Sequence, residues 1–425
     1  MEPPEDGELA ARLPADVLVD VLRRVTGPRS LAVSRCVCKA WRAIIDGEGL
    51  LRRQLPFSGI FICFRRLCLP EFFSRPASAG QPAISGKLDF LPRATELRPH
   101  GNCYIEDHCN GLLLLQGTYI DDHYVLNPAT RWWNTLPLCL DNRTGGIRRH
   151  PNGLHLHISC MYSLQGEAVG RRGCLFEKEM PQEQLQRRVC SLRANKTRSI
   201  GVDPFMCIVK SDFVMRISLS EDKYSVIKPP MDIGWSSYLG LSEKGVYCAS
   251  FVENTHIRVY ALTESCDQFE WILKNDYDLK PVQMFDGQVN GPWILEDINY
   301  EKFRSHLPNI NKEEVIQEKF EWNSDDDDFH ENLDIVEVQH RPYFEIEVLG
   351  FHPYKEILFL SRSEDCKLNA MAFAYHLNSF KVENLGSIYP TGHDYFSCSI
   401  PNESHEIDSF PYTPCWIEET PERVN

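Results

Sequence analysis

LPADVLVDVLRRVTGPRSLAVSRCVCKAWRAIIDGEGLL, residues 13–51, is the stretch around which the chain is organised. Its first half predicts one amphipathic helix, because apolar residues recur there at the spacing of a single helix face. Pro14 suits the first helical position, and Gly27 and Pro28 end the helix. The residues of the apolar stripe are Val17, Leu18, Val21, Leu22 and Val25.

The second half of the stretch predicts another amphipathic helix, with apolar residues again every three or four positions. They are Val33, Cys36, Val37, Ala40, Trp41, Ile44 and Ile45. A unit of about forty residues buries too little surface to be stable alone and usually needs a staple or a partner. We therefore expect the stripe with Trp41 to contact a second protein. The alternative is that the stripes form only an internal helical core.

The stretch resembles the F-box, the motif by which substrate receptors dock onto the Skp adaptor of cullin-type ubiquitin ligases. The resemblance rests on the Leu13-Pro14 opening, the Val-Leu pairs that follow it, and SRCVCKAWR at residues 34–42. It implies two partners, a Skp-type adaptor and, through it, a cullin. The residues that it implies for adaptor binding are Leu13, Pro14, Val17, Leu18, Leu22, Val33, Val37, Cys38 and Trp41.

The charge of the chain argues against nucleic acid and anionic membranes as partners. The formal net charge of the 425 residues is -15, which repels phosphate groups. Residues 11–66 nevertheless hold eleven Lys or Arg against four Asp or Glu, so the remainder is strongly acidic. A basic docking surface at the F-box would be steered toward an acidic partner.

The cysteine pattern and the absence of apolar runs predict a cytoplasmic and/or nuclear protein. The sixteen cysteines include no C-x-x-C pair, which favours reduced thiols over a disulfide framework or a zinc site. The acidic N-terminus MEPPEDGE shows no signal peptide, and no apolar run reaches the length of a membrane span. We expect no membrane partner.

Beyond the F-box, the sequence predicts antiparallel strands. Residues 107–138 read as a meander with strands at 112–115, 124–126 and 132–135, and the pattern recurs at 245–279 and 355–386. Half of it recurs at 212–230. Repeated short meanders predict a propeller-like domain, since one meander alone leaves a face uncovered. An irregular β sandwich is the alternative, and either way the fold class is α+β.

These blocks resemble the F-box-associated β domains common in plant F-box families, through phrases such as CNGLLLL and YVLNPATRWW. We expect a disordered leader at 1–10, the helical F-box at 11–55 and the β domain at 56–425. Two regions depart from the pattern. Residues 166–198 have few β-branched residues where the family has strands, and EMPQEQLQRRVCSLRAN within them, residues 179–195, reads as a short helix, which would leave a ring incomplete. Residues from about 286 to 342, with four adjacent Asp at 325–328, read as an acidic, flexible insertion.

No motif predicts catalysis, a cofactor or a metal. His155 and His157 would share one face of a strand, but no third ligand accompanies them. Residues 80–87 superficially resemble a phosphate-binding loop, yet Leu88 stands where a hydroxyl must bind magnesium. The sequence contains no G-x-S-x-G and no H-E-x-x-H. The aromatic residues that could form either a binding rim or core are Trp132, Trp133, Trp271 and Trp416.

The sequence therefore predicts a non-catalytic substrate receptor, with the F-box on the Skp adaptor and the β domain on an unknown target protein. Holding a target near the ubiquitin-transferring machinery raises its effective concentration without any chemistry by this chain. Two alternatives stay open. One is an F-box scaffold that does not promote degradation, and the other is a β-propeller enzyme with a helical appendix.

Overall fold

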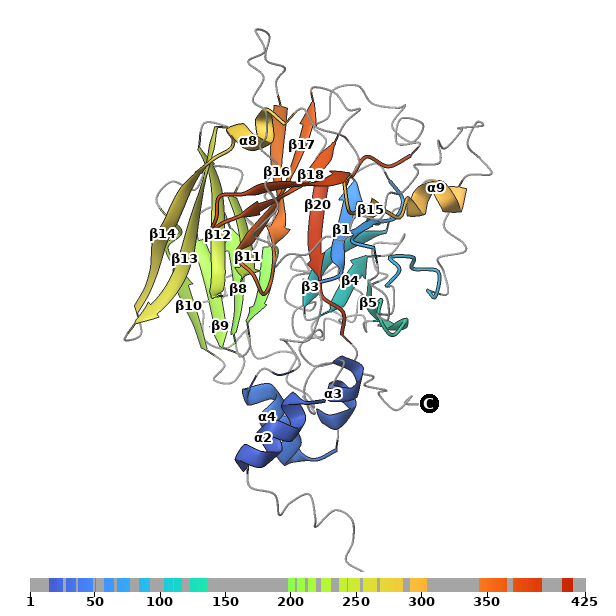
Figure 1. The fold of residues 1–425 in the computed structure, drawn as a ribbon, viewed down its shortest axis with the longest axis vertical. Coiled ribbons are helices and arrows are strands. Elements are labelled where there is room, and N and C mark those ends of the chain that lie inside the picture. Colours follow the sequence, from blue (N-terminus) through green and yellow to red (C-terminus); the bar gives the residue numbers. More distant parts are fainter. Residues whose placement is uncertain are drawn as a thin grey trace, which may run out of the picture.

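The computed structural model describes residues 15–135, 198–303, 344–391 and 407–415, with shorter gaps inside these ranges (Figure 1). Three short helices come first, and the described residues that follow are mostly antiparallel strands. This confirms the predicted α+β class. None of the described helices is long and apolar enough to cross a membrane. The leader, the 166–198 segment and the Asp run at 325–328 lie outside the described residues, except for Arg198.

The helices α2 (Ala15–Arg23), α3 (Pro28–Arg35) and α4 (Lys39–Gly47) share one small core. The prediction of a single helix from Val33 to Ile45 is wrong, because the chain turns between α3 and α4. The Val37 amide donates a hydrogen bond to the Ser34 carbonyl there, at 3.2 Å. This turn lets both helices contribute to the core, whose buried residues are Leu18, Leu22, Leu31, Ile45 and Leu50.

The β domain contains five four-stranded antiparallel sheets among the described residues. Four are meanders in chain order. The strands of the first two are β3 (Tyr104–Cys109), β4 (Leu112–Gln116), β5 (His123–Asn127) and β6 (Trp132–Thr135), then β7 (Arg198–Val202), β8 (Phe205–Lys210), β9 (Phe213–Ser218) and β10 (Lys223–Ile227). Those of the other two are β11 (Ser237–Ser242), β12 (Gly245–Val252), β13 (His256–Ser265) and β14 (Gln268–Asp278), then β16 (Phe344–Phe351), β17 (Ile357–Glu364), β18 (Met371–His376) and β19 (Val382–Ser387).

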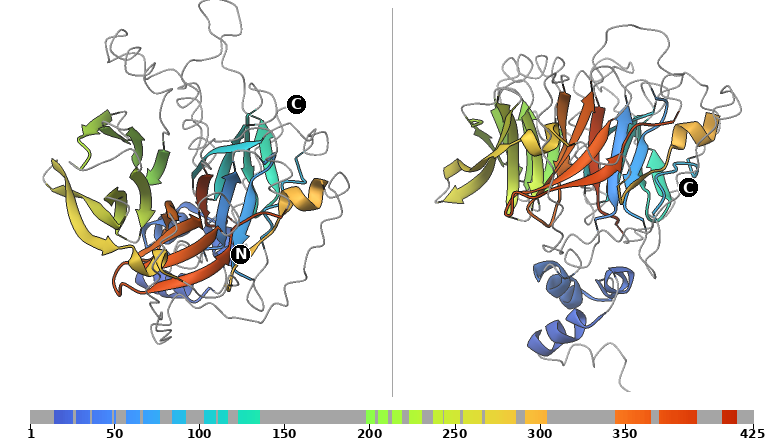
Figure 2. Two further views of the ribbon diagram at one scale, coloured as in Figure 1. Left: turned by 90° about the horizontal axis from the view of Figure 1, so that it is seen from above. Right: turned by 45° about the horizontal axis from the view of Figure 1, so that its top comes forward.

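The fifth sheet joins distant parts of the chain, in the order β15-β2-β1-β20. Its strands are β15 (Ile294–Leu295), β2 (Glu71–Ser74), β1 (Gly59–Phe64) and β20 (Ile407–Tyr412). The sheets adjoin through edge strands: β3 lies beside β7, β7 beside β11, β11 beside β16, and β16 beside β20. Seen from above, the sheets follow one another in space (Figure 2). This arrangement is compatible with the propeller-like prediction and with the irregular sandwich.

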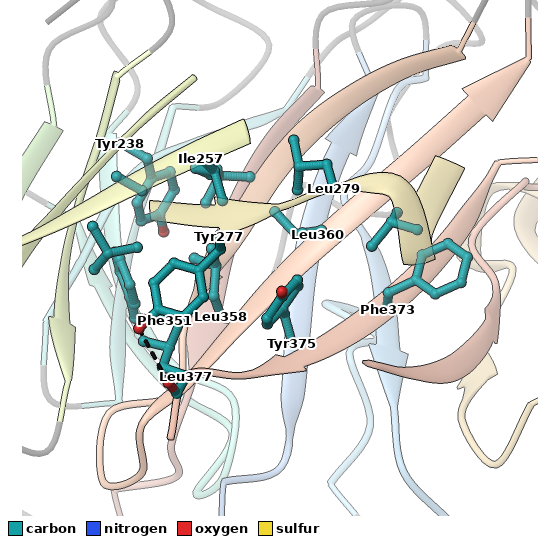
Figure 3. Packing of buried hydrophobic residues seen from close by; sticks show 14 of the residues in the cluster. Tyr238, Ile257, Tyr277, Leu279, Phe351, Leu358, Leu360, Phe373, Tyr375 and Leu377 are labelled. Carbon is teal, nitrogen blue, oxygen red and sulfur yellow. Dashed lines mark hydrogen bonds between the residues drawn. The ribbon is translucent and has the colours of Figure 1, made fainter. Parts of the chain in front are cut away.

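The apolar cores lie between neighbouring sheets. One cluster joins the β11–β14 sheet to the β16–β19 sheet, and Tyr277, Leu358 and Phe373 are among its members (Figure 3). Another joins the β1-containing sheet to the β3–β6 sheet through Phe61 and Leu113. Strands that are buried on both faces, such as β1, β4 and β18, read as runs of apolar residues rather than strict alternation.

The connection between β14 and β16 corrects the expected limits of the acidic insertion. Residues 291–303 are part of the fold: β15 pairs with β2, and α9 (Ile298–Phe303) follows. Trp293 and Ile298 are buried, so apolar anchors within this acid-rich segment attach it to the β1-containing sheet. Residues 304–342 lie outside the described residues. The short helix α8 (Lys280–Gln283) precedes this connection.

The last described residues fasten the β1-containing sheet to the β3–β6 sheet. The side-chain nitrogen of Asn127 donates a hydrogen bond to the Cys415 carbonyl at 2.8 Å. The side-chain oxygen of Asn127 accepts one from the backbone amide of Ala129 at 3.1 Å. Gly111 has φ of 82°, and a Cβ at this position would lie 2.5 Å from the Cys415 nitrogen. The turns with the sequences CNG and LNPAT therefore let the chain near Cys415 pack closely against the β3–β6 sheet.

Candidate functional site

The helical unit presents an exposed apolar surface. Val17 and Val21 lie one turn apart on α2 and are 42% and 44% exposed. Val33, on α3, and Val37, in the following turn, are 63% and 59% exposed. We call these four valines the docking surface. Half the large apolar side chains that are exposed among the described residues lie here, which makes the unit the candidate for protein contact.

The two leucines predicted to contact an adaptor lie on the inner side of α2. Leu18 is 4% exposed and Leu22 is fully buried, and both pack in the core shared with α3 and α4. Their contact with an adaptor stays a prediction; in this structure they hold together the helices that carry the docking surface. The difference arises because Leu18 and Leu22 occupy one edge of the apolar stripe, whereas Val17 and Val21 occupy the other.

The other predicted contact residues fall into three groups. Val17, Val33, Val37 and Cys38 are exposed. Trp41 is partly buried and packs against the helical core. Leu13 and Pro14 lie outside the described residues. Val21 was absent from the predicted set, although its spacing of four residues from Val17 could have placed it on the same surface.

The helical unit stands apart from the sheets. Figure 1 shows α2, α3 and α4 beneath the β domain, and the right view of Figure 2 agrees. The helices contact one another, with α2 and α3 both against α4. A salt bridge also ties α2 to the end of α4, because Arg23 Nη2 donates to Glu48 Oε2 at 2.8 Å. The described strands therefore leave the docking surface uncovered.

The candidate sites in the β domain have structural roles where they are described. Trp132, Trp133 and Trp271 are partly buried, and Trp133 packs against Tyr124 at 6.0 Å between ring centroids. The loop that resembles a phosphate site holds the chain's own carboxylate, since the Gly86 amide donates to Glu296 Oε2 at 2.9 Å. His155, His157 and Trp416 lie outside the described residues.

The buried thiols of the β domain are not candidate reactive groups. Burial raises the pKa of the Cys63 and Cys248 thiols to about 12, so both stay protonated and unreactive. No group of three His, Cys, Asp or Glu side chains that could hold a metal ion occurs in the described part of the chain. The docking surface on the helices is therefore the candidate site that the described geometry supports.

Comparison with known proteins gives a match at the same place. Residues 10–57 match the F-box-like family. One curated relative, an Arabidopsis thaliana protein named as an F-box protein, is 27% identical over 128 residues. The match covers 29% of this chain and 33% of the length of the Arabidopsis protein.

A solved structure, a post-proline cleaving enzyme from Rickettsia typhi, is 8% identical with a TM-score of 0.26. The matched region covers 91% of this chain and 59% of the Rickettsia typhi chain. A likeness this slight carries no argument about fold or activity.

Proposed function

Because the chain carries an F-box-like domain at residues 10–57, we propose that it is the substrate-recognition subunit of a Skp–cullin–F-box ubiquitin ligase. The helical unit binds a Skp-type adaptor, and the β domain, a propeller-like F-box-associated domain, binds the target protein. The complex works in the cytoplasm, the nucleus or both. The observation that carries the proposal is the docking surface, four exposed valines on a helical unit that stands apart from the sheets.

The exposed valines of the docking surface can contribute strongly to binding. Its valines are 42–63% exposed, and fully burying one valine contributes about 1.5–3 kcal/mol. Half of that for each of the four gives about 3–6 kcal/mol, or about two to four orders of magnitude in Kd. The surface can thus supply much of a specific contact, and the buried leucines keep its helices in place.

The proposed mechanism uses binding alone. The helical unit fixes the chain to the ligase, and the sheets hold the target so that its lysines lie near the charged conjugating enzyme. The resulting rise in effective concentration accelerates transfer while this chain contributes no reacting group. A chain of this kind is an adaptor subunit rather than an enzyme.

Co-purification of the full-length chain with a Skp-type adaptor tests the proposal. The variant with Val17, Val21, Val33 and Val37 all changed to serine should lose the adaptor. The matched control is Val226→Ser, which alters a valine on β10 that is 49% exposed, and it should retain the adaptor. Hydrogen exchange of residues 15–47 shows whether the helices remain folded. Equal adaptor recovery by the folded quadruple variant would overturn the proposal.

A further inference from the structure

Phe380 is an exposed aromatic residue in an unfavourable backbone conformation. It follows the turn after β18, where its amide donates to the His376 carbonyl at 2.8 Å. Its φ is 60°, in the left-handed region that bulky side chains rarely adopt. Its side chain is nonetheless 51% exposed. Glycine or asparagine would satisfy such a turn without strain, so the turn alone does not account for a phenylalanine here.

The corresponding turn in another sheet shows how a left-handed residue can be used by the fold. Arg131 lies between the third and fourth strands of the β3–β6 sheet and has φ of 56°. Its side chain bonds Asp89 at 2.9 Å and lies 5.1 Å from the Phe90 ring centroid. The Phe380 ring contacts Tyr277, and its side chain is 51% exposed.

The ring of Phe380 rests on a rigid support at the seam between two sheets. Its centroid lies 5.5 Å from that of Tyr277, which lies 5.4 Å from that of Tyr375. Tyr277 donates its hydroxyl to the Leu377 carbonyl at 3.1 Å (Figure 3), and Tyr375 donates to the Asp278 carbonyl at 3.2 Å. Both tyrosines are buried. An aromatic residue on such a support loses little freedom when a partner binds it.

The charges around Phe380 indicate the chemistry of the partner. Glu383 forms an ion pair with Lys381 at 2.9 Å, and His376 Nε2 lies 3.2 Å from its other carboxylate oxygen. Lys381 therefore balances the charge of Glu383, and Phe380 offers an apolar contact. The two sheets that form the seam are acidic: residues 237–285 and 344–391 hold eight Lys or Arg against thirteen Asp or Glu. Their field attracts a basic partner.

We propose that Phe380 is the anchor by which the β domain holds its target, a protein segment that presents an aliphatic or aromatic side chain flanked by Lys or Arg. This inference rests on the proposed function. Solitary exposed apolar residues are common and need no explanation. Phe380 differs because strained positions persist where function retains them, and because buried aromatic rings support it from beneath.

Selection from a phage-displayed random peptide library tests the proposal with the full-length chain as bait. The parent chain should enrich peptides that combine an apolar residue with Lys or Arg. Phe380→Gly removes the ring and relieves the left-handed strain, and it should weaken binding of those peptides by about tenfold or more. Arg131→Gly makes the same backbone change in the other sheet and should bind them as the parent does.

The melting temperature separates binding from packing. Phe380→Gly should melt at or above the parent temperature, whereas a ring needed only for packing on Tyr277 would lower it. Phe380→Asn, which tolerates the left-handed region, provides a second folded variant. The proposal is overturned if the parent enriches no such peptides or if either variant binds them unchanged. Adaptor co-purification should be the same for all these chains, so loss of the adaptor alone would count against the proposed function and not against Phe380.

Discussion

The attachment of residues 291–303 depends on Glu71, a fully buried carboxylate on β2. It accepts hydrogen bonds from the backbone amides of Ile298 and Asn299 and, at 2.7 Å, from the Asn299 side chain. Burial raises the pKa of Glu71 to about 7 from 4.5, since it disfavours the charged form more than these donors favour it. The nearby Asp297 raises the pKa further.

A pKa that is raised in the folded state makes stability depend on pH. Between pH 4.5 and about 7 the folded protein keeps the Glu71 proton, whereas the unfolded chain has lost it. The stabilising contribution is therefore fully present below pH 4.5 and is lost as the pH rises through about 7. At about 1.4 kcal/mol for each pH unit, the loss is on the order of 3 kcal/mol.

The Glu71→Gln variant tests this reasoning, because glutamine cannot ionise. We expect the free energy of unfolding of this variant to lack the fall between pH 5 and pH 8. The side-chain NH₂ of glutamine cannot accept the hydrogen bond of the Ile298 N–H, which lowers stability by an amount that does not depend on pH. Urea unfolding followed by tryptophan fluorescence measures the difference, since Trp293 is buried in the same segment. The control Glu301→Gln removes a half-exposed carboxylate from α9 and should keep the parent slope. Parallel pH profiles for parent and Glu71→Gln would refute the reasoning.

Three further substitutions test the cores and close contacts. Leu22→Ala should destabilise the helical unit by about 2–5 kcal/mol, measured as lost amide protection in residues 15–47 with protection of the sheets unchanged. Gly111→Ala should lower the melting temperature, because the new Cβ meets Cys415 at a φ of 82°; an unchanged melting temperature would contradict this. Arg362→Met should cost on the order of 3 kcal/mol in urea unfolding, because it leaves three backbone carbonyls at the end of α8 and just beyond it without their buried donor; a loss below about 1 kcal/mol would count against this role.

Apolar spacing was sufficient to predict the strands that bury one or both faces. The predicted strands at 112–115, 124–126 and 132–135 are confirmed as β4, β5 and β6. In the helical unit, spacing identified the stripe on α2 but could not tell which edge of it faces inward. That distinction depends on Leu31 and Ile45, which reach the same core only because the chain turns between α3 and α4.

Contacts between distant residues could not be predicted from local pattern. Glu71 reads as a polar residue at a strand end, and its donors come more than two hundred residues later, as the separation of 228 residues from Asn299 shows. The acidic composition around residues 286–342 likewise concealed the anchors Trp293 and Ile298. Phe380 carried no sequence signal either, because its left-handed backbone and half-exposed ring become visible only in three dimensions.

The sheet that contains β1 and β20 can be completed only after the end of the chain has been synthesised. β1 and β2 leave the ribosome early, whereas β20, which pairs along the whole length of β1, arrives more than three hundred residues later. Until then one side of β1 keeps its amide and carbonyl groups unpaired, a state prone to association with other nascent chains. A premature stop before residue 407 would make that state permanent, and a chain that ends there would be a candidate for aggregation or for clearance by quality control.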